Sequence, residues 1–136
     1  MAYQIKRNHI VEQLEIEDNG KTLTLSVDIN VDQILSRYNK AGYAMAMAQK
    51  AASIANNREE LDKAEEMMGE AVLSIFEVIF GHEQTEQIVE LYENRALEML
   101  ADISPFIAEV VQPKITEAQQ RIADRYKQTL KAPRRR

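Results

Sequence analysis

The dipeptide Asn19-Gly20 and the residues around it constrain the fold of this chain more strongly than any other segment. Asn and Gly tolerate the positive φ angles that a two-residue type I′ turn requires. The residues after the turn alternate strictly between apolar and polar, with the apolar positions at Leu23, Leu25, Val27 and Ile29. Such alternation is typical of a strand with one buried face. The sequence therefore predicts an antiparallel β-hairpin over about residues 10–29.

The turn also predicts which residues of the two strands face one another. With Asn19 and Gly20 as the loop, apolar residues pair across the strands: Ile16 with Leu23, Leu14 with Leu25, and Ile10 with Ile29. Glu12 opposite Val27 is the one mismatch, and we interpret it as part of a solvated acidic edge. A lone two-stranded hairpin is marginal in water. Either the chain's own helices cover its apolar face, or its edges pair with another subunit or partner.

Beyond the hairpin, apolar residues recur every three or four positions, which is the helical period. The chain has only four Gly and three Pro, too few for a many-turned β-sandwich or barrel. The predicted fold is mainly α with an N-terminal β-hairpin (α+β), as an antiparallel bundle of four to five helices. Helices are predicted over about residues 31–55, 58–80, 83–93 and 95–130. Kinks are expected near Pro105 and Pro113.

Capping residues set these boundaries. Asn30 with Gln33, and Asn57 with Glu60, have the spacing of a capping box at a helix start. Gly81 is positioned to end the second helix. At 136 residues the chain fits a single domain over residues 1–130, followed by a basic C-terminal tail at 131–136.

Composition and charge exclude several classes of protein. The chain has no Cys, which excludes disulfide scaffolds, thiolate zinc sites, iron–sulfur clusters and thiol nucleophiles. Its formal net charge is −5, which argues against nucleic acid as the main partner of its surface. The segment from Arg121 onward is nevertheless strongly basic. That segment is either a solvated end or a contact for an acidic partner or nucleic acid.

A search for catalytic or metal-binding patterns finds no complete one. Asp28, Asn30 and Asp32 match the first ligand positions of a calcium loop, but the later Gly and bidentate acid are missing. The two histidines, His9 and His82, have no second histidine at helical spacing. No Gly-rich phosphate loop or nucleophile elbow is present. We therefore predict no catalytic, cofactor-binding or metal-binding residues, no cofactor, and no enzymatic activity.

The apolar segments do not match a targeting or membrane-spanning sequence. The N-terminal residues lack the unbroken apolar stretch of a secretory signal. The most apolar window, residues 71–80, is interrupted by Ser74 and Glu77 and is about half the length of a membrane span. The sequence therefore predicts a soluble, cytoplasmic protein with no membrane partner.

Methionines on the first two predicted helices suggest an adaptable apolar surface, because Met tolerates varied partners. The same residues are also good candidates for an ordinary helix–helix core. We predict partner contacts from the second predicted helix, the hairpin face and the basic tail: Met67, Val72, Ile75, Phe76, Ile79, Phe80, Leu14, Leu25, Arg134, Arg135 and Arg136.

The order of elements and three short motifs resemble a known family. Two amphipathic helices follow the hairpin, and the second ends with Ile-Phe-Glu-Val-Ile-Phe-Gly at 75–81. The other two motifs come later in the chain, Ser-Pro-Phe-Ile at 104–107 and Val-Gln-Pro-Lys-Ile at 111–115. Over roughly residues 10–127, this layout resembles the tail assembly chaperones of long-tailed phages and prophages.

The resemblance implies a non-enzymatic protein of the host cytoplasm that is absent from the finished virion. Such proteins bind the long, largely helical tape measure protein, keep it soluble, and help major tail protein polymerise around it. Many are made in two forms through a ribosomal frameshift, for which residues 131–134 are a candidate site. Binding a long coiled coil requires many repeated contacts, so a homo-oligomer is expected.

Two other classes remain open from the sequence alone. A head–tail connector or tail-completion protein has the same composition but stays in the virion. A small bacterial adaptor or regulatory protein would use the basic tail on nucleic acid, with binding that weakens steeply with salt.

Overall fold

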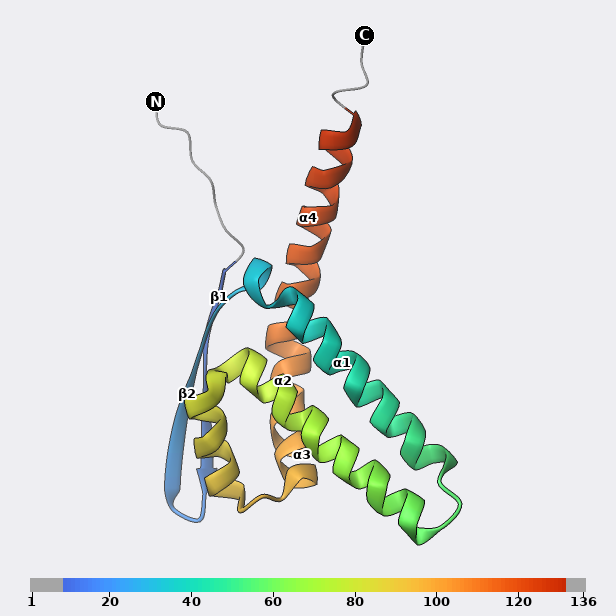
Figure 1. Ribbon diagram of the computed structural model, residues 1–136. Coiled ribbons are helices and arrows are strands. Elements are labelled where there is room, and N and C mark those ends of the chain that lie inside the picture. Colours follow the sequence, from blue (N-terminus) through green and yellow to red (C-terminus); the bar gives the residue numbers. More distant parts are fainter. Residues whose placement is uncertain (1–8, 132–136) are drawn as a thin grey trace.

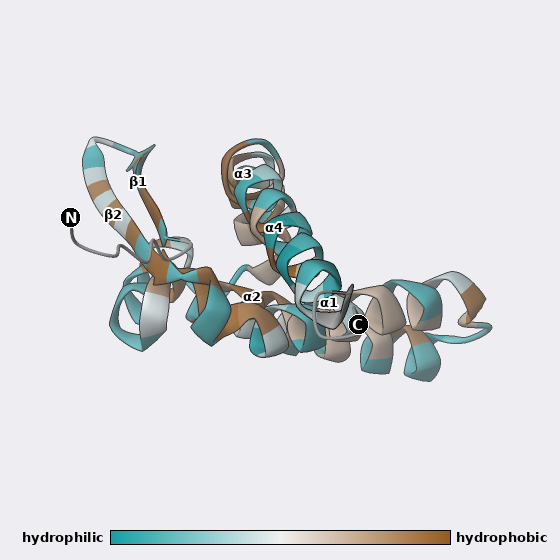
Figure 2. Ribbon diagram, turned by 90° about the horizontal axis from the view of Figure 1, so that it is seen from above, coloured by the Kyte–Doolittle hydropathy of each residue, from teal (hydrophilic) through white to brown (hydrophobic). Residues whose placement is uncertain are grey.

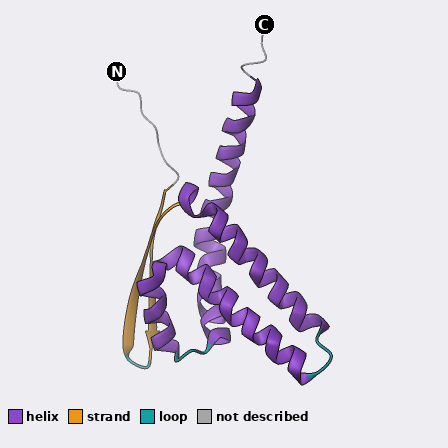
Figure 3. Ribbon diagram, in the orientation of Figure 1, coloured by secondary structure: helices purple, strands orange, loops and turns teal. Residues whose placement is uncertain are grey.

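The computed structural model describes residues 9–131, which form a two-stranded antiparallel hairpin followed by helices (Figures 1 and 3). The mainly helical fold with an N-terminal hairpin agrees with the sequence prediction. The elements in chain order are β1 (His9–Asp18), β2 (Lys21–Asn30), α1 (Val31–Ile54), α2 (Arg58–Tyr92), α3 (Ala96–Phe106), the π-helical turn η1 (Ile107–Val111) and α4 (Gln112–Lys131).

The hairpin has the predicted register. Asn19 and Gly20 both have positive φ, at 53° and 82°, as a type I′ turn requires. Ile10 lies opposite Ile29, and Leu14 lies opposite Leu25. Figure 2 shows apolar and polar residues alternating along β2. The predicted pairing is therefore confirmed.

The mismatched Glu12 has a structural partner that the sequence did not indicate. It lies opposite Val27, as predicted. Its Oε2 is 3.1 Å from Nζ of Lys114 on α4, and both side chains are partly exposed. An ion pair with this exposure contributes at most about 1 kcal/mol. Its main effect is to accommodate an acid on the apolar side of the hairpin, rather than leave it on a free acidic edge.

The prediction of four to five helices is wrong. Residues 9–131 contain three helical runs: α1, α2, and the uninterrupted series α3–η1–α4. The segments predicted as separate helices at 58–80 and 83–93 belong to α2, which bends at Gly81. There φ is 83° and ψ is 165°, a conformation that is essentially restricted to glycine. Gly81 thus redirects the helix, and the helical path resumes directly after it.

The two prolines do not break the last helical run. Pro105 lies inside α3, and Pro113 lies near the start of α4. Between them the helix widens into η1, in which the backbone N–H of Gln112 bonds to the carbonyl of Ile107. A proline cannot donate a backbone hydrogen bond. The irregularity expected at the prolines therefore takes the form of a π-helical turn between them, which ends two residues before Pro113.

The bend in α2 lets one helix contribute to two packing units. Before Gly81, α2 runs antiparallel to α1, and the two form a helical arm (Figure 1). After Gly81, α2 packs against β2. Phe76, Leu25, Ile79 and Ile88 are among the largest fully buried side chains. The chain's own helices therefore cover the apolar face of β2, which is the first of the two alternatives left open by the sequence.

Gln84 fixes the second half of α2 to the outer edge of β2. Its Oε1 accepts a hydrogen bond from the backbone N–H of Ser26, and its Nε2 donates to the Ser26 carbonyl, both at 2.7 Å. The same Nε2 also donates to the carbonyl of Phe80. One side-chain amide thus takes the place of a neighbouring strand at Ser26, next to the bend.

A second polar contact joins the end of α2 to α3. The hydroxyl of Tyr92, which is buried, donates to Oδ2 of Asp102 at 2.8 Å. Burial, the hydrogen bond to Asp102 and nearby carboxylates raise the pKa of Tyr92 above its ordinary value. The phenol is therefore neutral at physiological pH and acts as a donor.

Replacing Gly81 with Ala is expected to destabilise the fold by about 1–3 kcal/mol, because a Cβ strains this backbone conformation. No atom lies within 4 Å of the new Cβ, so steric collision contributes nothing to the cost. Gly69→Ala is the matched control. It sits inside α2 with only an ordinary 3.8 Å contact to Ala96, and it should stabilise by about 0.5–1 kcal/mol. Urea unfolding measures both, and equal effects would contradict a strained bend.

Tyr92→Phe is expected to lower the free energy of unfolding at pH 7 by about 1–3 kcal/mol, because Asp102 loses its donor. Above pH 10 the unfolded tyrosine loses its proton while the folded one keeps it, so the wild type loses stability as pH rises. The variant should lose less over this range. Thermal melts between pH 8 and 11 test this, and Tyr126→Phe, which removes a hydroxyl at an exposed position, is the matched control.

Candidate partner-binding site

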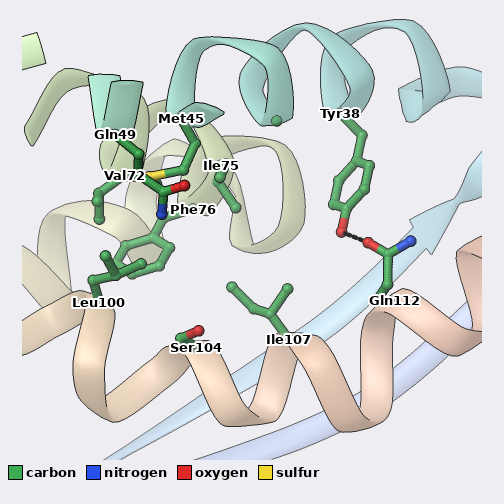
Figure 4. Close-up of a pocket in the computed structure, with 11 residues that line it drawn as sticks. Tyr38, Met45, Gln49, Val72, Ile75, Phe76, Leu100, Ser104, Ile107 and Gln112 are labelled. Atoms are coloured by element: carbon green, nitrogen blue, oxygen red, sulfur yellow. Dashed lines mark hydrogen bonds between the residues drawn. The ribbon is translucent and has the colours of Figure 1, made fainter. Parts of the chain in front are cut away.

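The three helical runs enclose a groove of about 270 Å³ where α1, α2 and the α3–η1–α4 series meet (Figure 4). α1 supplies one wall, the arm portion of α2 supplies the second, and the last helical run supplies the third. The lining residues are Tyr38, Gly42, Met45, Gln49, Val72, Ile75, Phe76, Leu100, Ser104, Ile107 and Gln112.

The chemistry of the groove is apolar at its centre and polar at its ends. None of the lining residues is charged. Figure 4 places Phe76, Leu100 and Ile107 around the central space, with Gln49 and the Tyr38–Gln112 pair lying apart from one another. Predominantly apolar walls with a few placed polar groups are typical of ligand-binding concavities. The groove is therefore suited to an apolar group of a partner that has an uncharged hydrogen-bonding group next to it.

A short hydrogen-bonded chain closes one end of the groove. The Tyr38 hydroxyl donates to Oε1 of Gln112, and Nε2 of Gln112 donates to the hydroxyl of Thr116 at 3.1 Å. Burial raises the pKa of Tyr38, so its phenol is protonated at physiological pH. Because Gln112 directly follows the π-helical turn, this chain ties α1 to the point where α4 begins.

The predicted partner-binding residues fall into four groups. Val72, Ile75 and Phe76 line the groove, and of these Val72 and Phe76 are fully buried. Met67 is 41% exposed, and Leu14 is half-buried. Ile79, Phe80 and Leu25 are buried in the core. Arg134, Arg135 and Arg136 lie outside the described residues.

Sequence reasoning missed the residues that α3 and α4 bring to the groove. Leu100, Ser104, Ile107 and Gln112 come from segments whose placement depends on the bend at Gly81. The apolar periodicity of residues 95–130 indicated that one face is buried. It did not indicate that part of this face stays open toward α1.

Sequence reasoning also missed an exposed apolar face on α1. Tyr43, Met47 and Ile54 are 68%, 40% and 64% exposed. Their spacing places them on one side of the helix, opposite the buried Ala41 and Ala48. Residues 41–55 contain a single charged residue, Lys50. The low charge of this segment, in which Lys50 is the one charged residue on the outward side, was the signal that could have revealed the surface.

The distal half of α4 projects beyond the rest of the fold (Figure 1). Ala118 is buried, whereas Arg121, Arg125, Tyr126 and Lys127 are exposed. This half of the helix is an exposed, basic surface, distinct in charge from the groove.

Within residues 9–131, no three His, Cys, Asp or Glu side chains are grouped so that they could hold a metal ion. None of the described helices combines the length and apolar character needed to cross a bilayer. Comparison with known proteins adds nothing further, since no family model, curated protein or solved structure matches the chain.

Tyr38→Phe is expected to lower the free energy of unfolding by about 1 kcal/mol, because the Gln112 carbonyl loses its donor. Tyr43→Phe removes the same hydroxyl from an exposed position on the same helix and should change stability by less than about 0.5 kcal/mol. Chemical denaturation of the two variants measures the difference. A Tyr38→Phe variant as stable as Tyr43→Phe would show that this hydrogen bond does not hold α1 to α4.

Proposed function

We propose that this protein is a non-enzymatic tail assembly chaperone of a long-tailed phage or prophage. In this role it binds helical segments of the tape measure protein, keeps them soluble in the host cytoplasm, and assists polymerisation of major tail protein. The observation that carries the proposal is the uncharged groove formed by all three helical runs. The element order and motifs that resemble this family are a second, independent support.

The size of the groove is sufficient for anchor side chains of a protein partner. At about 270 Å³, it accommodates one or two apolar side chains. Amphipathic helices bind in such grooves by inserting apolar anchor residues. A helical client with exposed apolar side chains fits this description.

The outward face of α1 offers a second apolar contact, on the side of the helix turned away from the groove. Tyr43, Met47 and Ile54 are on the side of α1 that faces away from α2. Met and Tyr side chains make adaptable contact surfaces. Each contact is small, so stable binding to a long client calls for several copies acting together. This is why we include self-association in the proposal.

Most of the predicted client contacts on α2 and β2 are buried. Ile79, Phe80 and Leu25 are in the core, and Val72 and Phe76 are fully buried as well, so a client reaches them only if the helices separate. Ile75, which is half-buried, lines the groove and is exposed in part. The proposed binding surface is therefore the groove, with Ile75 as its α2 contact.

The projecting basic half of α4 favours a second candidate, an adaptor that contacts nucleic acid or another acidic partner. Arg121, Arg125 and Lys127 are all exposed on this half-helix. Binding of a nucleic acid through such a surface falls steeply with salt concentration. Apolar client binding in the groove has little salt dependence, so a salt titration separates the two. A structural connector or tail-completion role is a further alternative, distinguished by presence in purified virions.

Gly42→Leu is the sharpest test of client binding through the groove. The Cβ position of Gly42 has no neighbour within 4 Å, so a larger side chain can occupy the groove without a backbone collision. Leu is also a better helix former than Gly. We expect the variant to fold with unchanged or higher stability, and to lose the ability to solubilise and co-purify with a co-expressed tape measure protein.

Ala46→Leu is the matched control, since it adds a Leu to an exposed position of α1 outside the groove. It should retain client solubilisation. If the wild type neither solubilises nor co-purifies with the client, the chaperone proposal is wrong. If Gly42→Leu solubilises the client as well as the wild type does, the groove is not the binding surface.

A further inference from the structure

Within residues 9–131, no strand pairs with the outer edge of β1. Gln84 bonds to both main-chain groups of Ser26, which shows that Ser26 directs its N–H and C=O away from β1. In an antiparallel pair, the residue opposite such a position also directs its main-chain groups outward. Gln13 lies opposite Ser26. Every second residue of β1 around Gln13 therefore presents its N–H and C=O at the outer edge.

The two edges of the hairpin differ in the hydrogen bonds that their outward main-chain groups make. At the edge of β2, Gln84 occupies the Ser26 position. At the edge of β1, no hydrogen bond from residues 9–131 reaches the outward main-chain groups of Val11, Gln13, Glu15 or Glu17. A ten-residue strand with an open edge is a template for pairing with another strand.

We propose that this edge pairs with the same edge of a second copy of the chain. The two β1 strands run antiparallel across a two-fold axis, and the two hairpins join into one four-stranded sheet. The axis passes between Gln13 and its symmetry mate. The strand is self-complementary in this arrangement, which is what a two-fold interface requires.

Charge selects this register among the alternatives. With Gln13 at the axis, His9 lies across from Glu17 of the second copy, and Val11 lies across from Glu15 of the second copy. Moving the axis to Glu12 or to Glu15 places two carboxylates directly opposite one another, which is destabilising. The acidic side chains thus exclude several registers and leave this one open.

The apolar face supports the same register. Leu25 and Val27 on β2 are completely buried, whereas Leu14 and Ile16 on β1 are only half-buried. Leu23 on β2 is half-buried as well, and Ile10 on β1 is buried, so the apolar face is incompletely covered toward the turn end of the hairpin. With Gln13 at the axis, Ile16 of each copy lies beside Ile10 of the other, and Leu14 lies beside Glu12, whose carboxylate pairs with Lys114. Placing the axis at Leu14 would instead set Ile10 against Asp18.

This dimer requires neither the groove nor a client. The paired edge belongs to β1, and none of the groove-lining residues lies on the hairpin. Dimerisation and client binding can therefore fail independently. A chain that solubilises its client as a monomer would disprove the dimer and the self-association included in the proposed function, while leaving client binding through the groove intact.

Single-cysteine cross-linking tests the register, because the natural chain contains no Cys. In the proposed dimer the Cα atoms of the two Gln13 residues are about 5.5 Å apart, within disulfide range. Gln13→Cys should form a covalent dimer under mild oxidation. Glu15→Cys is the matched control on the same face of the same strand. Its two Cα atoms are offset by four residues, about 13 Å, and should not cross-link.

Charge variants at Gln13 test the same axis without oxidation. Gln13 is exposed, so its replacement leaves the hairpin core intact. Gln13→Glu and Gln13→Lys each place like charges together and should weaken the dimer up to about fivefold. Mixing the two variants should restore association. Sedimentation velocity over a concentration series measures all three. The proposal is wrong if the wild type stays monomeric throughout, or if Glu15→Cys cross-links as fast as Gln13→Cys.

Discussion

The left-handed backbone at Gly81 is the constraint on which the rest of the structure depends. It divides α2 into a half that pairs with α1 and a half that packs against β2. Thr85 and Gln84 stabilise the bend by donating to the carbonyls of Gly81 and Phe80, each at 2.7 Å. Because Gln84 also holds the backbone of Ser26, the bend and the hairpin are fixed to one another. The direction of the arm relative to the sheet follows from this single residue.

The surfaces of the molecule divide by charge as well as by position. The groove and the outward side of α1 are almost free of charge, the distal half of α4 is basic, and the hairpin carries its acids on the solvent face and at Glu12. Apolar and charged contacts respond differently to salt. A protein organised in this way can bind one partner through apolar packing and associate with another through charge or main-chain pairing, without competition between the two.

The parts of the fold that depend on local chemistry were predictable from the sequence. Asn19-Gly20 determined the hairpin register, and Asn30 and Asn57 determined where α1 and α2 begin, each by accepting a hydrogen bond from the first turn. Gly81 was recognised as an interruption, but sequence does not show whether a helix ends at a glycine or continues in a new direction. The groove depends on that direction, since it brings distant segments together. Its α2 residues were therefore predicted as apolar partners, whereas Leu100 and Ile107 were not.

The π-helical turn between α3 and α4 sets the rotational phase of the last helix. A π-helical turn accommodates one more residue than an α-helical turn. Each residue of an α-helix rotates the following side chains by about 100°. Ile115 and Ala118 are buried. If residues 107–111 formed regular α-helical turns instead, α4 would rotate by about 100° and Lys114 and Glu117 would take their inward positions. The wider turn is therefore what gives the start of α4 its apolar inward side.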